Sequence, residues 1–332
     1  MSVAVVMTVR NEPQLLRPNL LYHRRAGIER CYLYDDGCSD GSVDRVRDLD
    51  VVRVTRSVGA AQIARRPEAE RFLAATRTLP ARQCLNVLDA IDRARADGFA
   101  WLLHVDADEL VCLDAGASRA GELREFLDAA PAATSQVTFA PYEVCRRRLA
   151  YGDVLREEVL FTAAVGTSRR LGWDPRARRP FVVRMPLGHR LGKSAVRLDA
   201  GLVPRNPHRF VTRDGRVPPT ERRPYLLHYY AFDAASFVTK FRNFVDLSME
   251  REVHGRPFPR WKRVWRDLVN DPSVSEDELH RYFGRWLLQG ERALARGRRG
   301  RRLFGFTLRE PSVVEIRAAR AAFADLARDG VQ

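Results

Sequence analysis

The chain has 332 residues, of which 45% are hydrophobic, enough to bury a large core in one domain or in a domain with appendages. No apolar run approaches the roughly 20 residues that a membrane-spanning helix needs. The net charge of +15 lies entirely in residues 136–332, because residues 1–135 carry 18 basic and 20 acidic residues. This asymmetry favours a polyanionic partner or an anionic surface, and a solvated, arginine-rich face is the alternative.

The N-terminal residues are apolar but lack a basic region before them and run directly into Arg10-Asn11-Glu12. We therefore expect no signal peptide. The cysteines are odd in number and fit no tight metal-binding spacing, which indicates reduced thiols in a cytoplasmic protein. They are Cys31, Cys38, Cys84, Cys112 and Cys145.

The first 55 residues alternate between strand and helix patterns. A continuous apolar and β-branched run over 2–9 predicts a strand that is buried on both faces. A helix over 13–26, which Gly27 ends, separates it from a second strand over 31–34. A short helix over 42–49 and a third strand over 51–54 follow. This order predicts an α/β fold with a mostly parallel central sheet and ligands at the carboxyl ends of its strands.

Polar clusters follow three of the predicted strands. Arg10-Asn11-Glu12 follows the first strand, an acidic loop from Asp35 to Asp40 follows the second, and Asp106-Ala107-Asp108 follows a strand that begins at Trp101. Because the carboxyl ends of parallel strands lie at one edge of a sheet, we expect the three clusters to face one crevice.

Asp106 and Asp108 are the strongest candidates for a metal site. Residues two apart on a strand share a face, so the two carboxylates converge if the strand that begins at Trp101 continues through them. No basic residue stands beside them in the sequence, and a divalent cation would relieve their repulsion. Oxygen ligands suit Mg²⁺ or Mn²⁺, particularly where substrate phosphates complete the coordination. A solvated acidic turn is the alternative.

The rest of the chain continues the α/β pattern and then becomes largely helical. His228 stands in a strand just before a helix that carries Lys240. Near the C-terminus, Arg292–Arg302 reads as an exposed basic segment, a candidate contact for anionic lipid headgroups or acidic glycans. A basic helix end is the alternative. The other expected elements are helices over 81–96, 122–129 and from about 234, and strands over 136–139, 181–184, 193–197 and 224–230.

Taken together, these motifs resemble the family 2-like glycosyltransferases with the GT-A fold. The resemblance is good over 1–112, patchy to about 245 and absent beyond. We therefore expect a GT-A-type (Rossmann-like) catalytic domain over 1–245 and a helical, basic C-terminal extension over 246–332. The motifs that carry the resemblance are Val9-Arg10-Asn11-Glu12, Tyr22 to Ile28, Tyr32 to Asp40, Trp101…Asp106-Ala107-Asp108-Glu109 and His228-Tyr229-Tyr230…Ser236-Phe237…Lys240-Phe241.

The resemblance implies a metal-dependent glycosyltransferase of the hexosyltransferase type, with a nucleotide-sugar donor, most simply a UDP-sugar. The acceptor would be a glycan, a lipid-linked compound or a small molecule with a hydroxyl group. In this interpretation the main chain of Val9 and Arg10, with Glu12 and Asp36, holds the nucleoside. Asp106 and Asp108 would contact the ribose and bind the Mn²⁺ or Mg²⁺ ion on the diphosphate. His228 would be the third protein ligand of that ion.

Direct displacement inverts the anomeric centre and needs a carboxylate as general base on the acceptor hydroxyl. Of the four candidates Glu143, Glu157, Glu158 and Asp174, we select Glu157 or Glu158. Glu109 is expected to orient the metal motif rather than act as base. Cations at Lys193 and Lys240 would stabilise charge on the leaving diphosphate.

Two other classes of function compete with this interpretation. A nucleotidyltransferase shares the sheet and the paired carboxylates but releases pyrophosphate. A non-enzymatic binder of an anionic polymer would depend on the basic second half alone, and no motif indicates sequence-specific binding of nucleic acid. We expect a cytoplasmic protein that contacts the inner face of the membrane peripherally through Arg292–Arg302.

Overall fold

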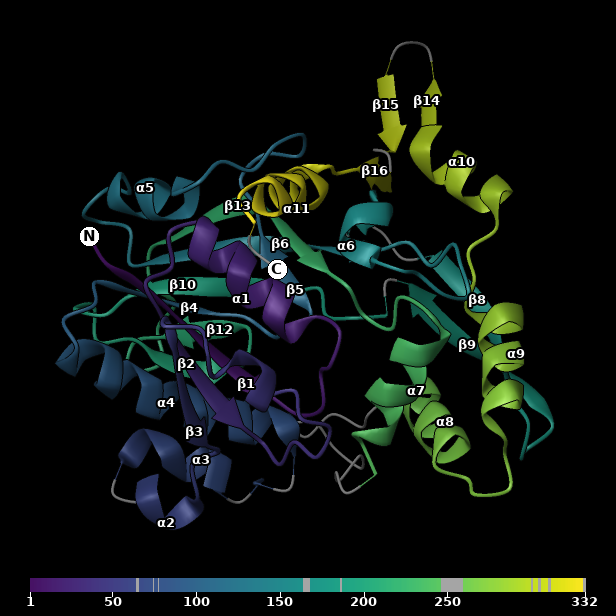
Figure 1. Ribbon diagram of the computed structural model, residues 1–332, viewed down its shortest axis with the longest axis horizontal. Helices are drawn as coiled ribbons and strands as arrows, with labels where there is room; N and C mark the ends of the chain where they lie inside the picture. Colours follow the sequence, from purple (N-terminus) through teal and green to yellow (C-terminus); the bar gives the residue numbers. More distant parts are fainter. Residues whose placement is uncertain are drawn as a thin grey trace.

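A curled central sheet of mainly parallel strands, flanked by helices, forms the body of the protein (Figure 1). The predicted α/β, Rossmann-like architecture is therefore confirmed, as are helices in the C-terminal region. The computed structural model describes residues 1–63, 66–73, 75–76, 78–163, 168–185, 187–245, 259–299, 301–303, 306–309 and 312–330. Within this part of the chain, no helix is both long and apolar enough to cross a membrane, and all five cysteines are free.

The N-terminal half supplies four parallel strands in the order β4-β1-β2-β3. All seven residues of the central strand β1 are buried, because helices cover both faces of the sheet. Alternate residues of β1 therefore enter two different cores, with Val5 packing in the core of α1 and Val6 in that of α4. The elements are β1 (Val3–Val9), α1 (Leu16–Arg25), β2 (Arg30–Asp35), β3 (Val52–Arg56), α2 (Ala60–Ile63), α3 (Glu70–Leu73), α4 (Leu79–Ala96) and β4 (Trp101–His104), with 3-10 turns at Asp44–Val46 and Pro67–Ala69.

Gly27 ends the first helix, as the sequence indicates. Its φ of +104° lies in the left-handed region that glycine adopts without strain. A Cβ at this position would also stand 2.7 Å from the Cβ of Arg124, at the start of the next helix on this face. The glycine is therefore needed both for the turn and for the close approach of these two helices.

The second half of the sheet mixes directions. Strand β10 runs antiparallel between β4 and β6, β6 pairs in parallel with β13, and the short β5 pairs with the end of β13. At its far end β6 pairs with β7, and β7 with β16. The elements are β5 (Glu109–Val111), α5 (Glu122–Asp128), β6 (Gln136–Val144), α6 (Val154–Glu157), β7 (Leu160–Ala163), β10 (Lys193–Arg197), β13 (Thr220–His228) and β16 (Val313–Glu315), with the hairpin β11 (Val203–Asn206) and β12 (Arg209–Val211).

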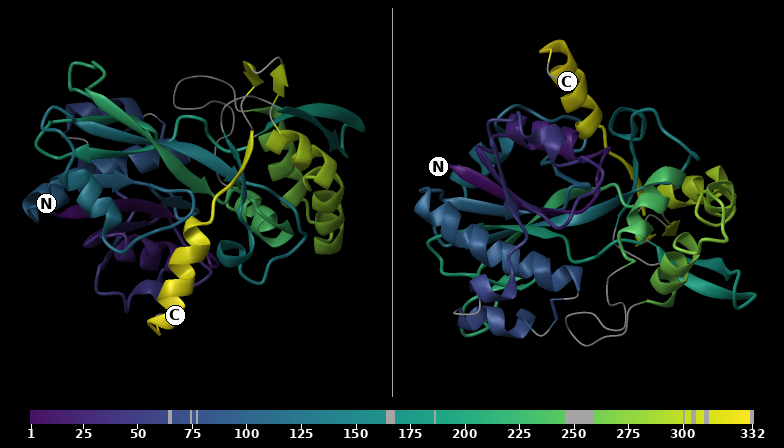
Figure 2. Two further views of the ribbon diagram at one scale, coloured as in Figure 1. Left: turned by 90° about the horizontal axis from the view of Figure 1, so that it is seen from above. Right: turned by 60° about the horizontal axis from the view of Figure 1, so that its bottom comes forward.

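A third, aromatic core gathers the helices at one end of the molecule (Figures 1 and 2). Phe237 and Phe241 of α7 pack on Trp265 of α8, and Phe237 also contacts Phe283 of α9. Asp233 begins α7 with a capping box that includes Ser236. The elements are α7 (Ala234–Arg242), α8 (Arg260–Val269), α9 (Glu276–Trp286), α10 (Glu291–Arg299) and the hairpins β8 (Ser168–Asp174) with β9 (Arg179–Met185) and β14 (Arg301–Leu303) with β15 (Phe306–Arg309).

The last segment of the chain returns to the central sheet. Strand β16 extends the sheet beside β7, and helix α11 (Ala318–Arg328) packs against α1 and α6. The predicted boundary between 245 and 246 stays a prediction, because residues 246–258 lie outside the described residues. Beyond them, α8 and α9 pack with α7, whereas β16 and α11 belong to the layers that residues 1–245 build.

Candidate active site

A cleft with about 890 Å³ of empty space lies where β1, β2 and β4 end. The three polar clusters that follow these strands all contribute to its lining, and α7 supplies the opposite side. Of the residues predicted to bind donor or metal, His228 is absent from the lining. The others line the cleft together: Val9, Arg10, Glu12, Asp36, Asp106, Asp108 and Lys240.

The two aspartates lie in a turn, so the condition that the strand continues through them is not met. Strand β4 ends at His104, and β5 begins only at Glu109. The buried Asn19 of α1 holds the turn, since its Nδ2 donates to the carbonyls of Ala107 at 2.9 Å and Glu109 at 2.7 Å. The Glu109 carboxylate in turn accepts the N–H of Asp106 at 2.7 Å. This contact agrees with the expected orienting role of Glu109.

Each aspartate has its own lysine, although neither lysine is near it in the sequence. The fully buried Lys193 places its Nζ 2.9 Å from Asp106 Oδ1, which also accepts Gln83 Nε2 at 2.7 Å. The ammonium of Lys240 contacts Asp108 Oδ2. The fold therefore supplies two cations that relieve the repulsion for which the sequence alone suggested only a metal ion.

The two aspartates differ in acidity. Burial raises the pKa of Asp106, and Lys193 only partly opposes this effect. Burial also acts to raise the pKa of Asp108, but Lys240 and His228 outweigh it and hold that pKa well below the ordinary range of a carboxyl. Asp108 is therefore an ionised carboxylate at neutral pH, the form that binds a cation.

Asp108 and His228 fit a divalent cation. His228 Nε2 lies 3.5 Å from Asp108 Oδ2, and both side chains are buried. Burial acts to lower the pKa of His228, but the charge of Asp108 raises it overall. A carboxylate oxygen and a deprotonated imidazole nitrogen at this separation are donors that Mn²⁺ accepts, and the ion would displace the proton that Asp108 favours on His228. Asp106 Oδ1 is engaged by Gln83 and Lys193, and its part in holding a metal ion stays a prediction.

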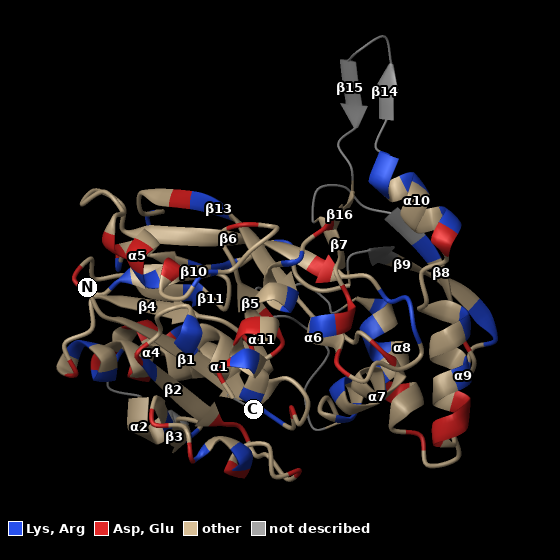
Figure 3. Ribbon diagram, turned by 45° about the horizontal axis from the view of Figure 1, so that its top comes forward, with Lys and Arg blue, Asp and Glu red and all other residues tan. Residues whose placement is uncertain are grey.

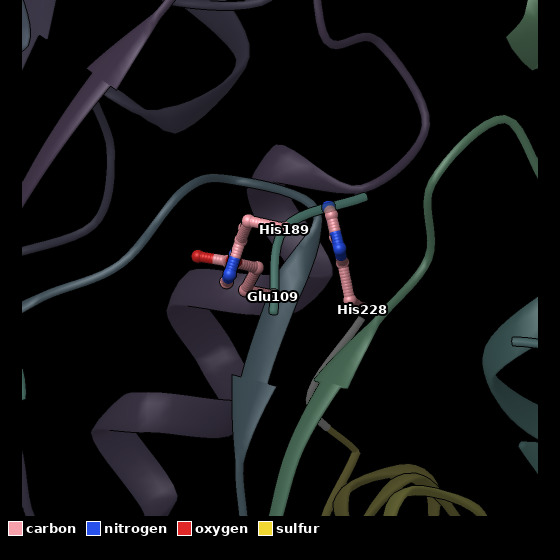
Figure 4. A group of neighbouring side chains, drawn as sticks. All are labelled: Glu109, His189 and His228. Atoms are coloured by element: carbon pink, nitrogen blue, oxygen red, sulfur yellow. The ribbon is translucent and has the colours of Figure 1, made fainter. Parts of the chain in front are cut away.

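A second group of side chains that could hold a metal ion shares His228 with this pair. Ligand atoms of Glu109, His189 and His228 all lie within 4.8 Å of one another, and Figure 4 shows His189 beside Glu109 with His228 at the end of β13. His189 Nε2 contacts the Glu109 carboxylate, and its Nδ1 accepts the N–H of Gly192 at 3.2 Å. Sequence reasoning missed His189, because a single histidine in a loop has no periodicity or spacing to mark it.

The loops after β1 and β2 are also held from outside their own segments. Arg82 of α4 makes two hydrogen bonds to Asp36, at 2.6 and 2.7 Å. Asn243, just after α7, donates to the carbonyl of Arg10 at 2.7 Å and accepts from Asn11 at 2.9 Å. Burial, with the charge of Asp108, raises the pKa of Glu12 to about 8. The cleft thus combines the carboxyl of Glu12, which holds its proton at neutral pH, with that of Asp108, which is ionised.

Glu157 and Glu158, our candidates for the general base, lie outside the cleft lining. Glu157 pairs with Arg148 and accepts the N–H of Asp153 at 2.7 Å. Glu158 is buried and accepts the hydroxyl of Tyr151 at 2.8 Å and two main-chain N–H groups at the start of β7. The contacts of Glu157 and Glu158 thus stabilise the junction of α6 and β7. The assignment of either residue as general base stays a prediction.

The other two carboxylates that were considered as base are engaged in ion pairs. Glu143 and Arg146 form a fully buried pair at 2.7 Å, and the Glu143 carboxylate also accepts the N–H of Leu187 at 2.8 Å. Asp174, on the hairpin of β8 and β9, lies 2.9 Å from Arg260. Neither lines the cleft.

The basic segment Arg292–Arg302 includes most of α10, far along the chain from the cleft residues (Figure 3). Arg298 and Arg299 line a surface hollow with Arg147, and Arg298 lies 3.5 Å from Glu315. Residue 300 and the side chains of 301 and 302 lie outside the described part of the chain. The contact with an anionic surface stays a prediction.

No protein-family model matches the chain. Over 137 residues it is 33% identical to "Glycosyltransferase-like At2g41451" of Arabidopsis thaliana, a match that covers 38% of this chain and 30% of that protein. The chain therefore matches less than a third of the length of this curated relative. This partial sequence similarity links the chain to a protein named as glycosyltransferase-like.

Similar solved structures were found at low TM-scores. HddC from Yersinia pseudotuberculosis is 9% identical with a TM-score of 0.31, covering 71% of this chain and 96% of that one. A 4-diphosphocytidyl-2C-methyl-D-erythritol synthase is 13% identical with a TM-score of 0.29, covering 59% and 75%. Likenesses at this level carry no weight for the activity of this protein.

Proposed function

We propose that the protein is a metal-dependent glycosyltransferase of the hexosyltransferase type. It would move a sugar from a uridine diphosphate sugar to a hydroxyl acceptor, with inversion. The observation that carries this proposal is Asp108 at the carboxyl edge of the sheet. This ionised carboxylate and the ammonium of Lys240 line the cleft, and the imidazole of His228, outside the lining, lies 3.5 Å from Asp108 Oδ2. Such a set suits a diphosphate bound together with its metal ion. The partial identity with a protein named as glycosyltransferase-like supports the same class.

The donor would bind across the three loops that line the cleft. The main chain of Val9 and Arg10, with Glu12 and Asp36, would hold the nucleoside, and Asp106 would reach the ribose. The bond from Asn243 to the Arg10 carbonyl supports this arrangement, because it keeps α7 beside the nucleoside loop. Asp36 is kept in place by Arg82.

Asp108 and His228 would hold Mn²⁺ or Mg²⁺, with Asp106 nearby. When bound, the ion supplies Lewis-acid stabilisation of the charge on the departing diphosphate. The ammonium of Lys240 lines the cleft and adds a positive charge on the same side. Lys193 does not line the cleft, so its role is to neutralise and orient Asp106. Glu157 or Glu158 would take the proton of the acceptor hydroxyl.

A panel of nucleotide sugars with Mn²⁺ tests the proposal. We expect release of free nucleoside diphosphate, with UDP-sugars the best donors, and a loss of about 10³-fold or more in Asp108→Ala, because an anchor of the metal is removed. Asp214→Ala is the matched control, since Asp214 is an exposed aspartate that pairs with Arg216 at 2.7 Å. Release of pyrophosphate instead would assign the protein to the nucleotidyltransferases, and equal activity of Asp108→Ala would overturn the metal site.

A further inference from the structure

A second hollow lies directly beside the cleft and shares part of its wall with it. It contains about 940 Å³ of empty space, and Gln14, Leu15 and Phe232 line both it and the cleft. Leu15 and Phe232 are almost fully buried, so they form a common partition and not a loose rim. A molecule in this groove, as we name the second hollow, therefore lies against residues that also line the cleft.

The far wall of the groove comes from the C-terminal helix. Phe323 and Leu326 of α11 line it, opposite residues from α1 and from the segment before α6. The helix is fixed at both sides, because Asp325 pairs with Arg25 of α1 and Arg320 donates to the Arg156 carbonyl at 2.7 Å. The groove is thus a built site, formed only when the last segment of the chain packs on the catalytic layers.

The lining indicates a neutral, largely apolar occupant. Its floor is made of leucine, valine and phenylalanine side chains from four segments. The two arginines of the lining already have carboxylate partners: Arg17 pairs with Asp48 at 2.7 Å and Arg156 with Asp153 at 3.1 Å. Tyr151 directs its hydroxyl to Glu158. Few polar groups therefore remain for a multiply hydroxylated ligand, and the apolar floor favours a hydrocarbon ring or chain.

We infer that this groove is the acceptor subsite and that it takes a neutral hydroxyl compound with an apolar ring or chain. The apolar part would lie between α11 and α1, and the hydroxyl would point past Leu15 and Phe232 into the cleft. This inference rests on the proposed glycosyl transfer. It narrows the acceptor from the broad class of hydroxyl compounds to amphiphilic, uncharged ones.

Direct binding of three probes tests the inference: hexyl β-glucoside, methyl β-glucoside and hexyl phosphate, each measured by ligand-detected NMR on the full chain. We expect hexyl β-glucoside to bind at least about tenfold more tightly than methyl β-glucoside, because each buried methylene contributes about fourfold. Leu326→Trp fills the groove and should weaken this binding about tenfold. Ala327→Trp is the matched control, since Ala327 is the exposed next residue of the same helix. Phe323→Ala gives a second, space-creating change, and circular dichroism checks that each variant is folded.

Binding of UDP with Mn²⁺, measured by calorimetry on the same proteins, separates the two proposals. We expect it to be equal in wild type, Leu326→Trp and Ala327→Trp. Equal binding of hexyl β-glucoside by folded Leu326→Trp and wild type, or preference for methyl β-glucoside or hexyl phosphate, would overturn the acceptor assignment. If wild type does not bind UDP but hexyl β-glucoside binding depends on Leu326, the donor proposal fails while the groove stands as an amphiphile site.

Discussion

Lys193 Nζ lies 2.9 Å from Asp106 Oδ1, and the lysine side chain is completely buried beneath the turn that carries the two aspartates. Strand β10 runs antiparallel beside β4 with Ala195 opposite Leu103, so Lys193 reaches just past the end of β4. Burial acts to lower the pKa of Lys193, but Asp106 and Glu109 raise it overall. Lys193 is therefore a buried cation at neutral pH.

Lys193→Met should therefore act on stability. It leaves Asp106 and Glu109 without their cation, and breaking a buried pair in this way costs about 3 kcal/mol of unfolding free energy. Lys240→Met should act mainly on turnover, because Lys240 lines the cleft and its side chain is 23% exposed. Urea unfolding and single-turnover kinetics on both variants check this contrast. A Lys240→Met protein with wild-type kcat would contradict the cationic role of Lys240.

Metal dependence should follow the donor set of Asp108 and His228. Chelation with EDTA should abolish turnover, and Mn²⁺ should restore more of it than Mg²⁺, because an imidazole ligand suits the softer ion. His228→Ala should raise the Mn²⁺ concentration needed for half-maximal activity by about tenfold or more. His280→Ala is the control, since this half-exposed histidine lies 3.9 Å from Glu276 on helix α9 and does not line the cleft. An unchanged Mn²⁺ requirement in His228→Ala would remove His228 from the ligand set.

The general base can be tested by conservative substitution of both candidates. If Glu157 or Glu158 takes the acceptor proton, its change to Gln should lower kcat by about 10²-fold or more and leave UDP binding unchanged. Glu158→Gln should also lower stability, because its buried carboxylate lies 3.5 Å from Arg147. The exposed Glu125→Gln serves as control. Wild-type kcat in both variants would exclude both residues as the base.

Stability should fall in acid partly through His23. Burial lowers the pKa of His23 to about 4, and its ring bonds Asn19, which holds the aspartate turn. The unfolded state takes up a proton near pH 6.5 and the folded state only near pH 4, so stability is lost as pH falls through this window, by about 1.4 kcal/mol per unit. Urea titrations at pH 7, 6 and 5 give the free energy of unfolding at each pH. This free energy should fall less steeply with decreasing pH in His23→Gln than in wild type or His280→Gln. An equal pH dependence of the unfolding free energy in all three proteins would refute the lowered pKa of His23.

The basic face of α10 gives a further prediction. If it contacts an anionic membrane, Arg298→Glu with Arg299→Glu should weaken sedimentation with phosphatidylserine vesicles about tenfold or more, since each basic residue near the surface contributes about 1 kcal/mol. Arg216→Glu is the control, because this arginine is also exposed but lies in a loop before β13. If the double variant still binds the vesicles as wild type does, Arg298 and Arg299 are not the membrane contact.

Local pattern in the sequence predicts much of this protein. The continuous apolar run of β1 specifies a strand buried on both faces, and its alternation with helices specifies a parallel sheet. Because parallel strands end at one edge, the polar residues that follow them had to meet. Glu12, Asp36 and Asp106 accordingly line one cleft.

Only the tertiary structure decides which charges face one another there. Lys193 reaches Asp106 because β10 inserts antiparallel beside β4, and His189 reaches Glu109 from a loop with no periodic pattern. The C-terminal helix completes the groove because it packs back on α1 and α6. Such contacts join residues far apart in the chain, and their energies depend on burial and distance in the finished fold, which no local spacing encodes.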